Sequence, residues 1–169
     1  MERISNLKEF LIEQIRELYD SEHQQLYFLT NAVKQVEHKE LQSLIQHHIK
    51  QTQEKVKRLK NILNQLFLTT NGEHSEIMKE MINTTTHLLD KSKSPKIKDV
   101  IIISSIQYMK HFGIAGYGSA YAYAEELGRR DIADQLHLSL SEEKEANNLL
   151  SDIALDEVNS EAKKTIMVF

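Results

Sequence analysis

The stretch LYDSEHQQLYFL (residues 18–29) places one carboxylate, Glu22, inside an otherwise apolar helical stripe. Apolar residues recur three or four positions apart between Leu7 and Val33, which is the spacing of one face of an α-helix. Glu22 falls on that face, with a leucine one turn away on either side. The pattern predicts a long helix over residues 6–36 that turns a charged side chain toward the protein core.

Three other apolar stripes carry a polar residue in the same way. Gln51, Lys110 and Glu143 each fall near the middle of a separate helical pattern, on its apolar side. A helix that buries one face normally fills that face with apolar side chains. Four helices that each turn one polar residue inward therefore predict a four-helix bundle with a buried polar site.

Turn residues mark the boundaries of the first half. A break without Gly or Pro is expected near residues 37–39, and the second helix then runs to a turn at 69–72, where Gly72 suits a left-handed terminal residue. A shorter helix is expected over residues 76–89. Its weak apolar face consists of Ile77, Met81, Thr84 and Leu88.

Capping residues mark the second half. Ser94 and Pro95 suit the N-cap and first position of a third long helix that ends at Gly128, and Asp131 is expected to cap the fourth. Two long helices, a crossover with a short helix, and two more long helices follow the order of a ferritin-like bundle. We expect an all-α fold with one domain over residues 1–158 and a tail over 159–169, which carries an apolar run at 166–169.

Composition narrows the class of protein. The chain has 169 residues, one Pro, five Gly, no Cys and a net charge of −4. The absence of Cys removes disulfides and thiolate chemistry, and the net charge gives no support to nucleic-acid binding. No apolar run reaches the length of a membrane span, so we expect a cytoplasmic protein that binds neither membrane nor nucleic acid.

The inward polar residues do not form an obvious metal site. A dinuclear carboxylate site in a bundle takes a Glu from each of two helices and a Glu-x-x-His from each of the other two, and no inward Glu-x-x-His is present. Gln51 is a weak neutral ligand, Gly113 provides none, and the ammonium of Lys110 repels a cation. Only Glu22, Glu143 and His48 remain for a metal, so we expect no cofactor, with iron or manganese as the alternative.

Two of these residues have open alternatives. Lys110 either extends to solvent between helices or pairs with Glu22 or Glu143, and full burial would make pairing nearly obligatory. His48 is either a ligand or, as is more frequent on an apolar face, a hydrogen-bonded core residue. The histidines expected to face solvent are His23, His38, His47, His74, His87 and His137.

Three glycines within six residues, Gly113, Gly116 and Gly118, need a reason, because glycine in a helix interior costs about 1 kcal/mol relative to alanine. Close helix–helix approach is the favoured reason, with nearby tyrosines filling space beside small residues. A phosphate-binding loop is excluded, because no strand precedes the glycines and no Lys-Ser/Thr follows them.

Motifs at residues 19–26, 48–59 and 107–118 resemble those of the YciE/YciF family of ferritin-like bacterial proteins. Residues 19–26 are similar to the family opening L-Y-D-A-E-x-Q-L. Residues 48–59 resemble H-x-x-E-T-x-x-x-x-x-R-L, and residues 107–118 resemble Q-x-x-E-H-Y-E-I-A-x-Y-G. The resemblance, which extends over about residues 6–155, implies a ferritin-like bundle, a homodimer and an association with bacterial stress responses.

The chain departs from the family at most of the site that the resemblance implies. Glu22 and Glu143 are kept, whereas other acidic positions carry different residues. The positions that match the family site are Glu22, Gln51, Lys79, Lys110, Gly113, Glu143 and Asn147.

Three hypotheses follow for the function. The first is a non-catalytic, stress-associated bundle protein whose ancestral metal site has become a polar or ion-paired core. The second is a residual metalloprotein that uses Glu22, His48 and Glu143 for oxidation or peroxide chemistry. The third is a module that binds a protein partner through its apolar C-terminal run.

Overall fold

The structure, a computed structural model, describes residues 4–72 and 74–164. Its α-helices are α1 (Leu7–Ala32), α2 (Lys39–Gln65), α3 (Glu76–Lys91), α4 (Pro95–Glu126), α5 (Arg130–Ile153) and α6 (Asn159–Lys164). A 3-10 turn (Val33–Gln35) follows α1, and a π-helical turn (Ala154–Val158) joins α5 to α6. The predicted all-α four-helix bundle, with a short helix in the crossover, is confirmed.

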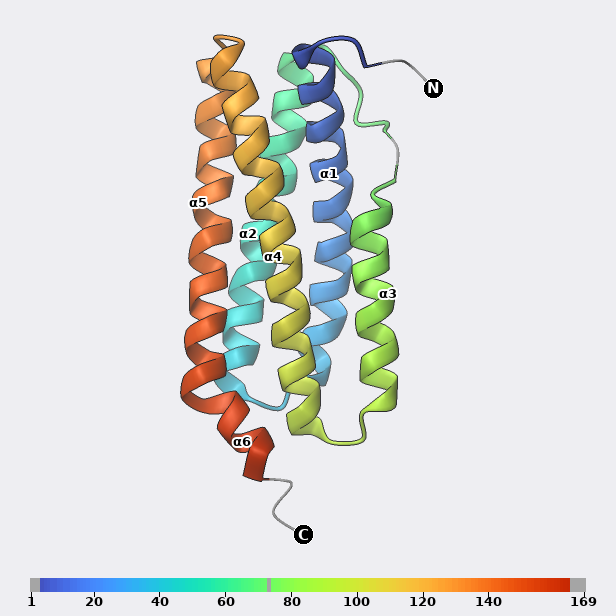
Figure 1. The fold of residues 1–169 in the computed structure, drawn as a ribbon, viewed down its shortest axis with the longest axis vertical. Helices are drawn as coiled ribbons and strands as arrows, with labels where there is room; N and C mark the ends of the chain where they lie inside the picture. Colours follow the sequence, from blue (N-terminus) through green and yellow to red (C-terminus); the bar gives the residue numbers. More distant parts are fainter. Residues whose placement is uncertain (1–3, 73, 165–169) are drawn as a thin grey trace.

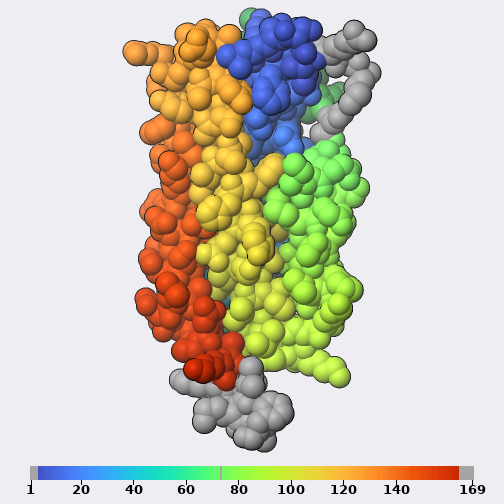
Figure 2. Space-filling view, viewed as in Figure 1, coloured from blue at the N-terminus to red at the C-terminus, as the bar shows by residue number. Residues whose placement is uncertain are grey.

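The four long helices α1, α2, α4 and α5 form the bundle, and α3 packs against α1 and α4 from outside (Figure 1). The crossover with α3 returns the chain to the end of the bundle at which α2 begins (the lower end in Figure 1). For this reason α2 and α4 run in the same direction, while α1 and α5 run in the opposite one (Figure 1). In the space-filling view, α1 reaches the visible face only above α3 and otherwise lies behind α3 and α4 (Figure 2).

The N-termini of the helices confirm one predicted cap and correct another. Ser94 caps α4 as predicted, since its hydroxyl accepts a hydrogen bond from the backbone N–H of Ile97 at 3.5 Å. The prediction for Asp131 was wrong: α5 begins at Arg130, and its N-cap, Arg129, makes no side-chain capping bond. The Asp131 carboxylate instead accepts a hydrogen bond from the Arg129 guanidinium at 2.8 Å.

The C-terminus of α2 differs from the prediction. The left-handed residue is Phe67, with φ of 57°, and not Gly72. The N–H of Leu68 bonds to the carbonyl of Leu63 at 3.0 Å, which closes the terminal turn well before the expected 69–72 segment. Gly128, predicted to end α4, does adopt the left-handed conformation, with φ of 68°.

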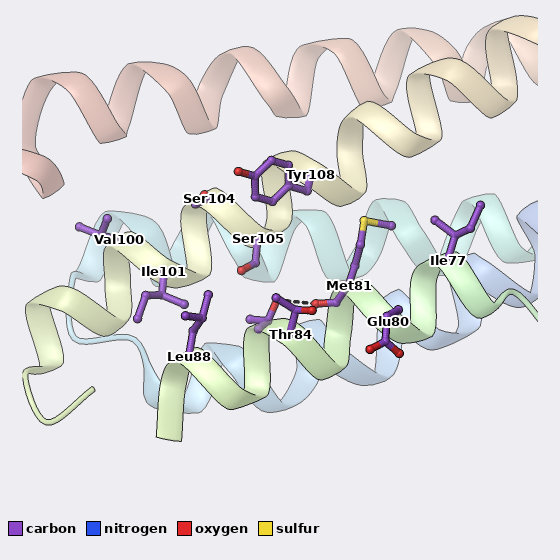
Figure 3. Close-up of a pocket in the computed structure, with 11 residues that line it drawn as sticks. Ile77, Glu80, Met81, Thr84, Leu88, Val100, Ile101, Ser104, Ser105 and Tyr108 are labelled. Atoms are coloured by element: carbon purple, nitrogen blue, oxygen red, sulfur yellow. Dashed lines mark hydrogen bonds between the residues drawn. The ribbon is translucent and has the colours of Figure 1, made fainter. Parts of the chain in front are cut away.

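The buried face of α3 is rotated from the predicted one. Met78, Thr85 and Leu89 are buried. Ile77 and Leu88 are instead 56% and 44% exposed. These two side chains line a surface groove between α3 and α4 rather than the core (Figure 3). The weak amphipathic pattern of this helix did not determine which face would be covered.

The core of the bundle consists of two apolar clusters separated by a polar layer. On α1, for example, one cluster contains Leu11, Ile15 and Leu18, and the other contains Phe28 and Leu29. The polar residues 21, 22 and 25 lie between these two groups and are buried. The interruptions in the apolar stripes thus share one level of the bundle, which places the candidate site at mid-height.

The C-terminal part continues as a helix into the segment predicted to be a tail. α6 covers Asn159–Lys164 and contacts α4, and Ala162 is buried. The apolar run at 166–169 lies outside the described residues. Within the described part of the chain, no helix combines the length and the hydropathy that crossing a membrane requires.

Candidate functional site

The polar layer contains four charged side chains, one from each long helix: Glu22 on α1, Lys55 on α2, Lys110 on α4 and Glu143 on α5. We call these four residues the charged cluster. Their exposed fractions are 2%, 0%, 1% and 1%, respectively. Charges at this depth are stable only when paired, because each loses several kcal/mol of hydration free energy on burial.

Each charge in the cluster has an opposite charge beside it. The Lys110 ammonium donates a hydrogen bond to Glu143 Oε1 at 3.0 Å. The Lys55 ammonium donates to the same oxygen of Glu143, and it lies 2.8 Å from Glu22 Oε1. Of the two alternatives open for Lys110, the structure therefore has the buried, paired one, with Glu143 as its partner.

Tyr117 of α4 completes the contacts of Glu22. Its hydroxyl donates to Glu22 Oε1 at 2.8 Å, and its side chain is fully buried. The Lys55 ammonium lies 5.9 Å from the centre of the Tyr117 ring. Tyr117 therefore does more than fill space beside the glycines, because it supplies a hydrogen bond to a buried carboxylate.

Gly113 is part of the same arrangement. A Cβ atom at this position would lie 3.0 Å from Glu143 Cδ and closer still to Glu143 Oε2. At Gly116, a Cβ atom would lie 2.8 Å from Leu18 Cδ2. These two glycines are therefore sites of close approach, as expected, and Gly113 provides the space for a carboxylate of the cluster.

The pKa values of the cluster follow from burial and pairing. Burial alone would raise the pKa of Glu143, but the neighbouring ammonium groups of Lys110 and Lys55 hold it below its ordinary value. Burial would lower the pKa of Lys55, yet the charges of Glu143 and Glu22 raise it above its ordinary value. For Lys110, burial prevails and lowers the pKa.

His48 lies beside the cluster as a neutral residue. It is fully buried, and burial together with the charge of Lys110 lowers its pKa to about 3. Neither of its ring nitrogens has a hydrogen-bond partner within the described residues, and the same holds for Glu22 Oε2 and Glu143 Oε2. His48 is thus a buried core histidine.

A second, half-buried ion pair lies next to the cluster. The Arg58 guanidinium donates to Glu142 Oε2 at 2.9 Å and to the Ser139 hydroxyl at 2.6 Å. Arg58 belongs to α2, and both partners belong to α5. These bonds fix the two helices that carry Lys55 and Glu143 relative to each other.

Other predicted site positions lie apart from these contacts. Gln51 and Asn147 are half-buried, and within the described residues neither forms a hydrogen bond or ion pair with the charged cluster. Lys79 is on the surface, where its ammonium pairs with Glu76 at 2.9 Å. Among the histidines expected to face solvent, His38 is half-buried, because its Nε2 lies 2.9 Å from Glu157 Oε2.

Lys55 was not among the predicted site residues, although its position carried a signal. The apolar stripe of α2 passes through His48, Thr52 and Leu59 and is spaced by three and four residues. The step between Thr52 and Leu59 is too long for one helical turn, and position 55 fills it. Lys55 therefore continues the stripe that the apolar residues of α2 define.

The residues of the cluster do not fit a dinuclear metal centre. Both carboxylates already use one oxygen for ammonium groups, and the two lysines bring two positive charges into the space that cations would need. Adding a divalent ion would leave two uncompensated charges in the core, at a cost of several kcal/mol each. Within residues 4–72 and 74–164, no set of three or more His, Asp or Glu side chains is arranged to hold a metal.

A surface groove lies between α3 and α4. It has a volume of about 530 Å³, and its apolar lining comes from Ile77, Met81, Leu88, Val100, Ile101 and Tyr108. In the close-up, these side chains come from the two helices on either side of the groove (Figure 3). One carboxylate, Glu80, and several hydroxyls complete the lining, which gives no pair of groups suited to acid–base chemistry.

Comparison with known proteins supports the resemblance found in the motifs. Residues 6–163 match the family described as "Domain of unknown function (DUF892)". Protein YciF of Escherichia coli (strain K12) is 23% identical over 161 residues, which cover 95% of this chain and 97% of that protein.

Two solved structures share the fold. The crystal structure of the E. coli stress protein YciF has a TM-score of 0.86 at 23% identity and covers 92% of this chain and 99% of its own. YcfI from Rhodopseudomonas palustris, for which a structural role has been suggested, also has a TM-score of 0.86, at 27% identity, and the match covers 89% of this chain and 96% of that one. The chain belongs to the DUF892 family, and the predicted relationship to YciF is confirmed.

Proposed function

We propose that this protein is a non-catalytic, stress-associated helical bundle in which ion pairs replace the dinuclear metal site that the family resemblance implies. The observation that carries the proposal is the bonding of Glu143, whose Oε1 accepts hydrogen bonds from Lys55 and from Lys110. The two carboxylates and two ammonium groups of the charged cluster sum to zero charge. The cluster therefore needs no external cation.

The burial of the charged cluster also supports a non-catalytic role, because a substrate has no access to it. The charged cluster and Tyr117 are at most 2% exposed, so a substrate cannot reach them without opening the bundle. The groove between α3 and α4 is accessible but offers no pair of acid–base groups. An apolar groove and a neutral core suit a structural or binding role better than an enzyme.

The stress association rests on the relatives. YciF is described as a stress protein of E. coli, and it matches nearly the whole chain. We extend that association to this protein. We further propose that it is cytoplasmic, as its composition led us to expect, and that it is a homodimer, as the family resemblance implies. Light scattering of the purified protein tests the dimer, and its abundance before and after osmotic or oxidative stress tests the association.

Metal analysis of protein purified without an affinity tag tests the central proposal. We expect iron and manganese far below one equivalent per chain, and no acceleration of Fe(II) oxidation or of peroxide breakdown. A stoichiometric metal that is lost in Glu22→Gln would establish the alternative, in which Glu22, His48 and Glu143 are ligands. Glu142→Gln, which changes a carboxylate outside the charged cluster, is the matched control.

A further inference from the structure

Lys55 and Lys110 are placed differently within the charged cluster. The Lys110 ammonium contacts one carboxylate, Glu143. The Lys55 ammonium contacts both, since it pairs with Glu22 and with Glu143. Lys55, on α2, is thus the cation that joins the two carboxylates of the cluster, which lie on α1 and α5.

We propose that the charged cluster is a binding site for a primary ammonium group, and that the chain fills it with its own lysines, Lys55 being the bridging cation. This inference rests on the proposed function and adds the chemical class that the site recognises. A primary ammonium carries one positive charge and several N–H donors, and it can donate to more than one carboxylate oxygen. A metal ion would compete with the ammonium groups for the charge of the same two carboxylates.

The surroundings of Lys55 suit the rest of an alkylammonium ion. The whole Lys55 side chain is buried, so its methylene stem lies in the core together with its charge. The ring of Tyr117 lies 5.9 Å from the ammonium, within the range of a cation–π interaction. A cation with an apolar stem and N–H donors therefore matches the site better than a hydrated inorganic ion does.

The balance of charge predicts which cation each variant accepts. Lys55→Ala leaves two carboxylates and one ammonium, so one monovalent cation restores neutrality. Removing Lys55 and Lys110 together leaves two carboxylates without a compensating positive charge, so one divalent ion restores neutrality. The preferred external cation should change from an alkylammonium in the single variant to Mn²⁺ in the double variant.

The first test uses n-propylammonium, which has the carbons and the ammonium that Lys55→Ala removes. The variant is refolded from urea with increasing n-propylammonium, and its unfolding midpoint is measured at constant ionic strength. A ligand that binds only the folded state raises the midpoint with the logarithm of its concentration. We expect that saturable rise with n-propylammonium, and none with tetramethylammonium, which has no N–H donors, or with sodium.

Lys57→Ala is the matched control, because Lys57 is an exposed lysine two positions along the same helix that pairs with Glu54. Its midpoint, and that of the unmodified protein, should not respond to n-propylammonium. Equal responses in Lys55→Ala and Lys57→Ala would overturn the proposal. If Lys55→Ala is unfolded in plain buffer, recovery of its helical circular dichroism on adding n-propylammonium is the equivalent readout.

Lys110→Ala keeps the test decisive if Lys55→Ala cannot be recovered. The Lys110 ammonium contacts one carboxylate, so its removal should lower the stability less than the removal of Lys55. In this variant too, n-propylammonium should raise the unfolding midpoint, and tetramethylammonium and sodium should not. No rise in either variant would refute the ammonium site. Mn²⁺ should stabilise the double variant and not Lys55→Ala, and equal stabilisation of both would refute the charge argument.

The proposed function and this inference fail in different ways. A stoichiometric metal in the unmodified protein would remove the proposed function. Metal-free protein whose lysine variants ignore n-propylammonium would leave the proposed function intact and remove the ammonium site.

Discussion

The carboxylate of Glu143 occupies the space that a side chain at Gly113 would need. A Cβ atom built on Gly113 would lie 3.0 Å from Cδ and 3.2 Å from Cγ of Glu143, and closer still to its Oε2. Because residue 113 of α4 has no side chain, the carboxylate of Glu143 on α5 can reach the lysines. The glycine and the ion pairs therefore belong to one arrangement.

Gly113→Ala should destabilise the protein, although alanine favours helices. The added Cβ must displace Glu143, and overpacking a filled core costs about 1–3 kcal/mol, which exceeds the gain in helix propensity. Urea unfolding measures the change in free energy. Gly118→Ala is the control on the same helix, because its nearest contact would be an ordinary 3.9 Å to Leu140. The free energy of unfolding of Gly118→Ala should rise by up to about 1 kcal/mol. An equal rise in Gly113→Ala would contradict the placement of Glu143.

Tyr117→Phe should weaken the protein without changing its fold. The substitution removes the hydroxyl that donates to Glu22 at 2.8 Å inside the core. A hydrogen bond to a charged group contributes about 1.5–3 kcal/mol, so the free energy of unfolding should fall by that order. Tyr123→Phe is the control, since Tyr123 is half-buried on the same helix and its ring packs on Phe10. Similar losses in both variants would show that the bond to Glu22 contributes little.

The fold was predictable from the sequence because its strongest signals are local. The stripes of the four long helices, the Ser94-Pro95 start and the turn at Gly128 after α4 all depend on neighbours within a few residues, and the structure retains each of them. Two of the errors arose at helix ends, where the deciding contacts are local as well. Arg129 draws the carboxylate of Asp131 away from its capping role, and Phe67 ends α2 although glycine is the usual residue there.

The site was predictable in position but not in composition. Interrupted stripes located Glu22, Lys110 and Glu143 at one level of the bundle. For Lys110 the sequence left open whether its ammonium extends to solvent or pairs with one of the two carboxylates. Lys55 was missed because a lysine on a helix is usually solvated, and only the opposing carboxylates make its burial favourable. That information lies in α1 and α5, far from Lys55 in the sequence.

Two neighbouring substitutions test which face of α3 is buried. Met78 is 1% exposed, whereas Ile77 is 56% exposed and lines the groove. Removing a buried methionine side chain costs about 2–5 kcal/mol, so Met78→Ala should lower the unfolding midpoint strongly. Ile77→Ala should cost much less. The face predicted from the sequence alone requires the opposite order, so the two midpoints distinguish the two registers.

The neutral, buried His48 should make the protein sensitive to mild acid. In the unfolded chain its imidazole takes up a proton near pH 6.5, but in the folded protein burial and the charges of Lys110 and Lys55 lower its pKa to about 3. Between these values the unfolded state binds more protons than the folded state, so stability falls as the pH is lowered. From pH 7 to pH 5 the expected loss is about 2 kcal/mol. Glu143 adds little to this loss, because its pKa is held below its ordinary value of 4.5 and the stability it contributes is lost mainly below pH 5.

Urea unfolding at pH 7 and at pH 5 measures this effect. His48→Gln should remove most of the difference between the two pH values, whatever it does to stability at neutral pH. His47→Gln should leave the difference intact, because His47 is exposed on the preceding position of α2. A difference that persists in His48→Gln would assign the acid sensitivity to another group and would contradict the burial of a neutral imidazole beside the charged cluster.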